Sequence, residues 1–587
     1  IWIDGFESFT GQRQNLIKEL IKCSVGVTLS LNIDALSLKE LKNSQDWEAF
    51  KIVHDTYNFL TQGFEENVNI VSMKYNKCSD EIRAIEKNMF SINEEVFNKN
   101  TDDVQIYSSL NSYTETEKTA SKIISLARDS GYRWKDIAVA LGDMDSYGIN
   151  IKKVFTQYEI PFFLDKKRDI VRNPLTKFVL SLLDMYVFNF KHDSVFEFLK
   201  TGFSSLNYDE VSKLENFALQ YGIEGEKWFR PFKFNGKNID YFNKLREKFA
   251  KDLNVPRKEF KQLNNANDIT VFLFDFLNTF KVQEKIEKQV SVFKKSGMYE
   301  MSSENAQVWN YVIDILEQII LTGKDILLTP YEYKKMIEAG FREVKISIIP
   351  PTLDKVTVGE IDKISLKSFK AVFIMGANEG KLDSKKNEKG LLLHEERDFL
   401  SQVGIKILKN SEYYLYKEKH LLYKVFTSFT EKLFVSYALG TSDGKTLQKS
   451  MYVERLKQLF PLIKEESDLN VVSYISKVSN SKGTIDALIS AMRDYTEGKN
   501  IDSVWKDVYS WYEKNDRAVL KIINQGLSYD NKAENITKEN LEQIYQFPVT
   551  MSVSRLENFA TCPFKFFMEN IIEPQPRLVQ KIEFYDL

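Results

Sequence analysis

The stretch from residue 371 to residue 376, Ala-Val-Phe-Ile-Met-Gly, constrains the fold of this chain more than any other segment. It is apolar throughout and follows Lys370, so it predicts a strand that is buried on both faces. Strands of that kind belong to parallel sheets with helices on both sides. Gly376, Asn378 and Gly380 come at the carboxyl end of the strand, where open α/β sheets place their binding crevices. We therefore expect a parallel α/β sheet with a crevice near these residues.

A second region upstream has the pattern of the same architecture. Val104–Ser108 alternates like a strand, and a capping box at Thr114–Glu117 predicts the start of a helix that Gly131 ends. Further strands are predicted over 137–141 and 160–164, with a helix between them. This βαβαβ order is typical of a parallel sheet with right-handed crossovers.

Length and composition limit the class of protein. At 587 residues the chain is too long for one core, so several domains are expected. The formal charge of −2 argues against a protein that coats nucleic acid but is compatible with a local basic channel. Cys23, Cys78 and Cys562 are too widely spaced for a disulfide framework and indicate a reducing cytoplasm. No apolar run is long enough to span a membrane, so no membrane association is expected.

The first residues carry a short motif. Residues 1–4, Ile-Trp-Ile-Asp, read as the end of a buried strand, so we expect the sequence to be an internal fragment of a longer protein. Gln14–Lys22 has the apolar periodicity of a helix. From the residues alone, Asp4 is a turn or helix-cap residue between the strand and this helix.

Residues 551–567 carry the most specific motif. Ser552 or Ser554 can cap a helix, and Pro563 restarts a helix directly after Cys562. From the residues alone, a lone cysteine in an apolar helix pair is by default buried and inert.

Taken in order, these motifs resemble the UvrD-type helicases of superfamily 1, in the degenerate form found in AddB and RexB, the second subunits of bacterial helicase–nucleases. Asp4 matches the Mg²⁺-binding aspartate of motif II, whereas Gly5 stands where active motors carry the glutamate that activates water. Gly359–Lys367 takes the place of motif V without its nucleotide-facing residues. Phe426–Thr430 takes the place of motif VI but contains no arginine, a residue that supplies much of the catalysis of phosphoryl transfer. The resemblance implies a helicase fold without a working motor, and no ATP binding by this chain.

The motif around Cys562 resembles the opening of the iron–sulfur nuclease domain of the same family. The resemblance implies that Cys562 is the first ligand of a [4Fe–4S] cluster, whose other three cysteines would lie near the far C-terminus. It also implies that a PD-(D/E)XK-type nuclease domain begins here, with its Mg²⁺-dependent catalytic residues beyond Leu587. No catalytic residue is expected within this sequence.

The family implies the second, AddB-type subunit of an ATP-dependent helicase/exonuclease that resects double-strand DNA ends for recombinational repair. An AddA-type helicase/nuclease subunit would complete the heterodimer and drive translocation with ATP. The inactive helicase-like body would bind and scan single-stranded DNA, with Phe6 and Phe9 as candidates for base stacking. Packing at a domain interface is the alternative role for both rings. The alternative function is a non-catalytic, RecC-like DNA-binding scaffold, and the sequence context of Cys562 favours the nuclease-bearing subunit.

The fold class expected is α/β: a degenerate superfamily 1 helicase with RecA-like parallel sheets and a helical insertion, followed by the start of a nuclease domain. Residues 190–340 are predicted to be helical throughout. The expected segments are the end of domain 1A (1–100), the first half of domain 2A (101–188), a helical 2B-like insertion (189–344), the second half of domain 2A (345–460), a helical connector (461–547) and the start of the iron–sulfur nuclease domain (548–587).

Overall fold

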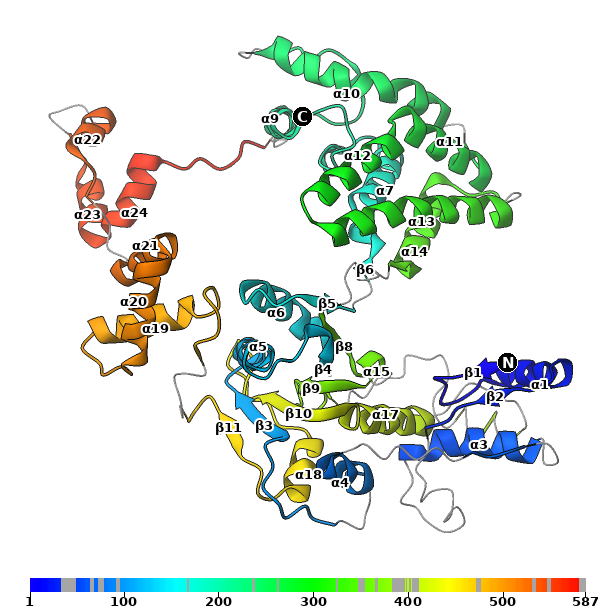
Figure 1. Cartoon of the computed structure of the whole chain (residues 1–587). Coiled ribbons are helices and arrows are strands. Elements are labelled where there is room, and N and C mark those ends of the chain that lie inside the picture. Colours follow the sequence, from blue (N-terminus) through cyan, green and yellow to red (C-terminus); the bar gives the residue numbers. More distant parts are fainter. Residues whose placement is uncertain are drawn as a thin grey trace. The chain divides into compact units, whose positions relative to one another are not determined.

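The computed structural model divides the chain into two compact units (Figure 1). One unit comprises Ile1–Lys166 and Thr352–Tyr529, and the other comprises Lys167–Pro351 and Asp530–Leu587. The residues that the structure describes are 1–32, 49–63, 68–71, 79–90, 95–165, 168–234, 238–260, 263–323, 326–346, 354–364, 368–382, 396, 399–400, 403, 411–470, 477–529, 535–545 and 550–579.

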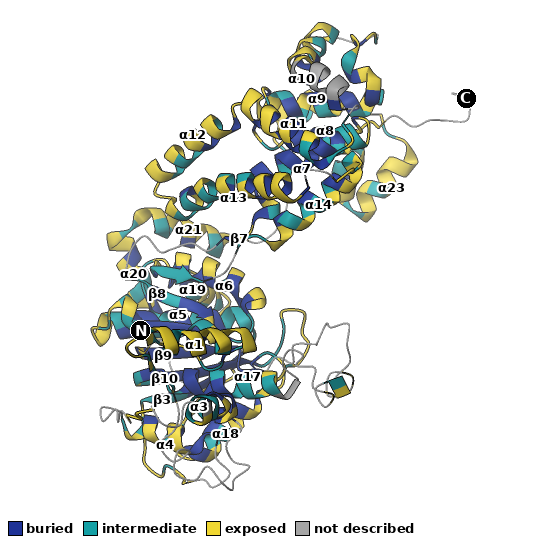
Figure 2. Ribbon diagram, turned by 90° about the vertical axis from the view of Figure 1, so that its right-hand side faces the viewer, coloured by how far each residue is buried: buried dark blue, intermediate teal, exposed yellow. Residues whose placement is uncertain are grey.

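The first unit is built on a seven-stranded parallel sheet, which confirms the expected α/β fold class. Its strand order is β11-β3-β10-β9-β4-β8-β5. The strands are β3 (Val104–Ser109), β4 (Ile137–Leu141), β5 (Phe162–Leu164), β8 (Val356–Glu360), β9 (Phe369–Met375), β10 (Phe429–Ala438) and β11 (Glu465–Ser467). The apolar run that begins at residue 371 lies in β9, between β10 and β4. Figure 2 shows β9 and β10 among the buried parts of the chain.

Both faces of the sheet are covered by helices because both faces of its central strands are apolar. In β9, Ala371 and Phe373 pack on one side, whereas Val372 and Ile374 pack on the other, and all four are fully buried. The helices on the first side are α5 (Ser112–Asp129) and α6 (Met144–Gln157). Those on the second side are α4 (Asp80–Asn88), the short α15 (Ile361–Ile364), α17 (Ser411–Phe426) and α18 (Met451–Leu459). The result is a three-layer, RecA-like arrangement.

Two details of this unit differ from the sequence expectations. The predicted capping box at Thr114–Glu117 is wrong, because α5 begins earlier, with Asn111 as its cap. The side chain of Asn111 accepts from the amide nitrogens of Tyr113 and Thr114, and the Thr114 hydroxyl accepts from the Asn111 amide. The segment expected to be a helical connector contributes an edge strand, β11, which pairs with β3.

The first residues form a smaller element of the same unit. Strands β1 (Trp2–Ile3) and β2 (Thr28–Leu29) are parallel, and α1 (Gly11–Cys23) connects them. Helix α3 (Lys51–Gly63) follows. The predicted helix at Gln14–Lys22 is confirmed as part of α1.

Between β6 (Arg168–Asp169) and its antiparallel partner β7 (Lys345–Ile346), the second unit is helical, as expected for residues 190–340. Its helices there are α7 (Pro174–Val187), α8 (His192–Leu199), α9 (Tyr208–Tyr221), α10 (Ile239–Phe260), α11 (Ala266–Thr279), α12 (Val282–Lys295), α13 (Tyr299–Gly323) and α14 (Pro330–Glu343). Helix α7 packs into this helical core through Phe178 and Leu182. Helix α7 therefore lies in the same compact unit as the helices that follow it.

Two helical segments follow the sheet in sequence. Helices α19 (Ile485–Thr496), α20 (Val504–Asn515) and α21 (Arg517–Ser528) share a small core around Trp505, Tyr512 and Ile523. Helices α22 (Lys538–Ile544), α23 (Val553–Thr561) and α24 (Pro563–Phe567) belong to the second unit. Across the described residues, every helix is too short or too polar to cross a membrane.

Candidate nucleotide and nucleic-acid sites

The carboxyl end of β9 is filled by the protein's own side chains. Glu115 of α5 is fully buried there and accepts hydrogen bonds from the Gly376 amide at 2.8 Å, the Ser436 hydroxyl at 2.6 Å and the Tyr147 hydroxyl at 2.6 Å. Gly376 has φ +68°, and a Cβ atom at this position would lie 2.8 Å from the Tyr147 ring. The position therefore requires glycine, both for its backbone conformation and for space.

Asn378 closes the same edge two residues later. Its amide group donates to the carbonyls of Ala438 and Gln448 and accepts from the Ala438 amide, at 2.8, 3.0 and 3.1 Å. The side chain is fully buried, so its hydrogen bonds serve the fold. The residues expected to line a crevice instead anchor the loop after β9 to β10 and its neighbours.

Burial sets the electrostatics of this edge. Removal from water raises the pKa of Glu115 above its ordinary value, because a charged carboxylate is poorly solvated there, and the three hydrogen bonds and Lys381 oppose the rise. Burial and the neighbouring Glu115 also raise the pKa of Tyr147. The Tyr147 hydroxyl therefore keeps its proton and remains a donor to Glu115.

The motif II-like loop follows β1. Asp4 lies at the carboxyl end of this strand, is exposed, and accepts a hydrogen bond from the Ser30 hydroxyl. Gly5 has φ +79° with open space around it, so no carboxylate stands where a motor would activate water. Within the described ranges, no three His, Cys, Asp or Glu side chains are grouped so as to bind a metal ion.

Glu7 joins this loop to α17 through a largely buried ion pair. Its carboxylate lies 2.9 Å from the Lys424 ammonium, and the two side chains are 17% and 8% exposed. Ser8 and Tyr413 share a hydrogen bond of 2.6 Å, and the Thr56 hydroxyl of α3 donates to the Glu7 carbonyl at 2.9 Å. The loop is thus bound on two sides by side chains of its own chain.

The motif VI-like turn offers no free positive charge. The Ser428 hydroxyl is buried and donates to the Val425 carbonyl, and the Thr427 hydroxyl donates to the Tyr423 carbonyl, each at 2.8 Å. Lys424 is occupied by Glu7. The arrangement does not reproduce the arginine contact of a phosphoryl-transfer site.

The motif V-like stretch is described only in part, since residues 365–367 lie outside the described residues. Lys363, its one described lysine, pairs with Asp165 at 2.8 Å. Here too the charged group is used within the fold.

The two aromatic candidates for DNA stacking lie in different environments. Phe6 is 43% exposed, with the Arg13 guanidinium 5.7 Å from its ring centre, whereas Phe9 is 8% exposed. The ring centres are 5.5 Å apart. Phe6 and Arg13 can offer a stacking face with a positive charge. Phe9 is buried, so its ring is not accessible to a base.

Cys562 lies between α23 and α24. It caps α24, its Sγ accepting from the Lys565 amide at 3.4 Å, and it is half-buried rather than fully buried. Of the two candidate caps of α23, Ser552 and Ser554, Ser552 is the cap, since its hydroxyl accepts from the Arg555 amide.

The surroundings of Cys562 fit one ligand of a cluster but not a complete site. Leu556, Phe559 and Phe564 are each more than half exposed, so this segment presents an apolar surface. The whole sequence has three cysteines, fewer than the four thiolates that such a cluster usually requires. Chemistry through a [4Fe–4S] group cannot be built from this chain alone.

Sequence reasoning missed the residues that close these sites. No local sequence pattern indicates the roles of Glu115 and Lys424, because their partners lie hundreds of positions away. Gly376 and Glu115 are 261 positions apart, and Lys424 and Glu7 are 417 positions apart. The one available signal was the polar Ser436 within the apolar second half of its strand, residues 433–438, which indicates a buried hydrogen-bond partner.

Two protein families match parts of the chain. The family described as "ADDB, N-terminal" matches residues 1–94, and "ATP-dependent helicase/deoxyribonuclease AddB fifth domain" matches residues 471–524, which include α19, α20 and most of α21.

Curated relatives extend this similarity along the chain. One from Clostridium botulinum strain Langeland, named as the second (B) subunit of an ATP-dependent helicase/deoxyribonuclease, is 33% identical over 617 residues, covering 100% of this chain and 53% of that protein. Proteins of the same name from Clostridium acetobutylicum and Alkaliphilus metalliredigens are 32% and 33% identical, covering 97% and 98% of this chain and 52% of each relative. The chain thus spans about half the length of the curated relatives it matches.

Proposed function

Since the chain belongs to the AddB family, we propose that it is the helicase-like body of the AddB-type subunit of an ATP-dependent helicase/deoxyribonuclease. In this role it binds single-stranded DNA while DNA ends are resected for repair in the cytoplasm. An AddA-type subunit supplies the ATP-driven movement. The chain itself contributes binding and guidance.

The Glu7–Lys424 ion pair is the observation that carries this proposal. In a motor of this fold, the motif II loop and the motif VI helix must respond to bound nucleotide. Here the two elements are bridged by a pair of opposite charges with little access to water. Opening the bridge would leave a poorly solvated charge without its partner, which favours a fixed body over a moving one.

Single-stranded DNA binding is assigned first to the exposed Phe6–Arg13 face. A base stacked on Phe6 would place its phosphate near the guanidinium. The test is fluorescence anisotropy of the whole chain with a labelled oligo-dT. Phe6→Ala is expected to weaken binding about tenfold, the effect of one lost base stack. Leu16→Ala, an exposed apolar residue of α1, is the matched control. Equal loss in both variants would remove Phe6 from the interface.

The nuclease part of the proposal concerns the longer protein. Cys562 would supply one thiolate of a [4Fe–4S] cluster that staples the nuclease domain, and the Mg²⁺ needed for cleavage would be bound by residues outside this chain. Iron content and the visible absorption of the full-length protein test this. Cys562→Ser is expected to lose the cluster, and Cys23→Ser is the control. Retention of iron in Cys562→Ser would remove Cys562 from the ligand set, and absence of iron from the unmodified full-length protein would favour the RecC-like scaffold.

A further inference from the structure

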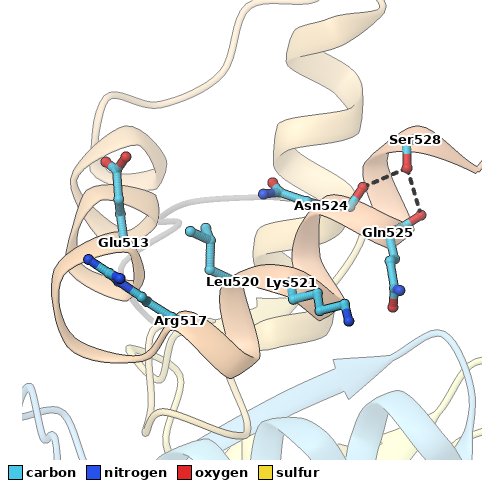
Figure 3. A pocket seen from close by; sticks show the side chains of 7 residues that line it. All are labelled: Glu513, Arg517, Leu520, Lys521, Asn524, Gln525 and Ser528. Atoms are coloured by element: carbon cyan, nitrogen blue, oxygen red, sulfur yellow. Dashed lines mark hydrogen bonds between the residues drawn. The ribbon is translucent and has the colours of Figure 1, made fainter.

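A groove of about 630 Å³ runs along α21 beside the end of α20 (Figure 3). The motif residues described above do not contribute to it. Its lining residues are Glu513, Arg517, Leu520, Lys521, Asn524, Gln525 and Ser528.

The groove lies on one face of a helix whose opposite face is in the core. Six of the lining residues recur along α21 at spacings of three, four and one, which is the spacing of one helix face. Ile523 is fully buried against α19 and α20, and Val519 and Leu527 pack beside it. The groove therefore stands on a packed three-helix element.

The two cations of the groove, Arg517 and Lys521, are exposed. No carboxylate of the described residues lies within ion-pair distance of Arg517 or Lys521, although many other lysines and arginines of this unit are paired. Arg517 and Lys521 are four positions apart in sequence, or about 6 Å along the helix. Two adjacent charges of this kind match neighbouring phosphates of a nucleic-acid strand.

Two side-chain amides extend the row of donors. The oxygen of the Asn524 amide accepts from the Tyr509 hydroxyl at 2.9 Å, which turns its N–H groups away from that contact. Gln525 lies beside it in the groove. The Ser528 hydroxyl is occupied by the carbonyls of Asn524 and Gln525 and adds no donor.

The remaining two residues, Leu520 and Glu513, restrict where a ligand can lie in the groove. Leu520 is half-buried and places an apolar patch beside the cations, against which a sugar or a base can pack. Glu513 lies at one end, where its negative charge repels phosphate. Contact with a backbone would therefore run from Arg517 toward Gln525.

We propose that this groove is a second contact for single-stranded DNA, with Arg517 and Lys521 on two phosphates and Asn524 and Gln525 donating to the same backbone. The inference rests on the proposed function and deepens it. A row of donors beside an apolar patch suits an extended strand better than a single inorganic phosphate, which needs one compact pocket.

The test is the salt dependence of oligo-dT binding by the whole chain. Two lost phosphate contacts lower the slope of log affinity against log salt by about 1.4. Between about 50 and 200 mM salt, Arg517→Gln/Lys521→Gln should therefore lose about sevenfold less affinity than the unmodified chain. Lys506→Gln/Lys514→Gln, on α20 outside the groove, is the matched control and should keep the original slope. Circular dichroism verifies that each variant is folded.

Each outcome decides the matter. If the unmodified chain binds oligo-dT and both double variants keep its slope, the groove does not contact DNA, and the proposed function stands without it. If both variants change the slope equally, the effect belongs to net charge, and the groove is again excluded. If the unmodified chain does not bind oligo-dT at all, the proposed function and this inference both fail.

Discussion

The carboxyl edge of the parallel sheet and the groove face of α21 both carry polar side chains, but those at the sheet edge are buried and those on α21 are exposed. At the sheet edge, Glu115 and Asn378 are fully buried and each makes three hydrogen bonds within the chain. On α21, Arg517 and Lys521 are exposed. The residues after β9, which were expected to line a binding crevice, therefore stabilise the fold. The exposed cations lie instead on α21, in the helical segment that follows the sheet.

The largest effect is expected from breaking the bridge between the motif II-like loop and α17. Lys424→Ala should lower the free energy of unfolding of the sheet unit by about 3 kcal/mol, because Glu7 would keep a poorly solvated charge without a partner. Hydrogen exchange of peptides that cover β9 and β10 measures this unit separately. Lys432→Ala, which breaks a more exposed pair with Asp103, is the control and should cost about 0.5 kcal/mol.

A double variant sharpens the same point. Glu7→Gln/Lys424→Met removes both charges and should recover most of the loss, since neither charge is then left buried. If Lys424→Ala costs no more than Lys432→Ala, the bridge does not hold the loop.

The next effect tests how tightly the sheet edge is closed. Gly376→Ala should cost about 2 kcal/mol, since the new methyl group meets a Tyr147 ring whose hydroxyl is held by Glu115, and φ is positive. Gly380→Ala has a similar φ, +71°, but open space, so only about 1 kcal/mol of backbone strain is expected. Both losses of unfolding free energy are measured by the same hydrogen-exchange experiment. If they are equal, the carboxyl edge of the sheet at Gly376 has room for a ligand.

The smallest effect is a pH dependence of the same edge. Because burial raises the pKa of Glu115 above 4.5, its value in the unfolded chain, folding favours the protonated carboxyl. Its contribution to stability is therefore full below about pH 4.5 and declines as pH rises through the folded pKa. Glu115→Gln should make the stability of the sheet unit depend less steeply on pH above that value. Stability would be measured by urea titrations at several pH values. If Glu115→Gln leaves its dependence on pH unchanged, the raised pKa of Glu115 is contradicted.

Much of the sheet could be predicted because its signal is local. The apolar run of β9 and the alternating pattern of β3 identify strands by themselves, and the order of strands and helices indicates a parallel sheet. Local signals were also sufficient to limit the cap of α23 to Ser552 or Ser554 and to identify the helices between residues 190 and 340. They failed at α5, where Asn111 and Thr114 form the box, because several polar residues near a helix start can act as its cap.

The closing contacts could not be predicted from local pattern. Glu7 meets Lys424 and Glu115 meets Gly376 only because the tertiary fold brings them together, and no spacing in the sequence encodes that. Strand β11 is three residues long and polar, so its sequence resembles that of a loop, and it is recognised as a strand only by its pairing with β3. The assignment of α7 to the helical unit likewise follows from what its apolar residues contact, since a buried helix looks the same in either domain.

The central claim is that this body binds single-stranded DNA without using ATP. The most direct test adds Mg²⁺–ATP to the purified chain and follows three quantities together: oligo-dT affinity, ATP hydrolysis and separation of a forked duplex. The account predicts that affinity is the same with and without ATP, and that neither hydrolysis nor strand separation occurs. Strand separation that depends on ATP, or hydrolysis stimulated by DNA, would contradict it.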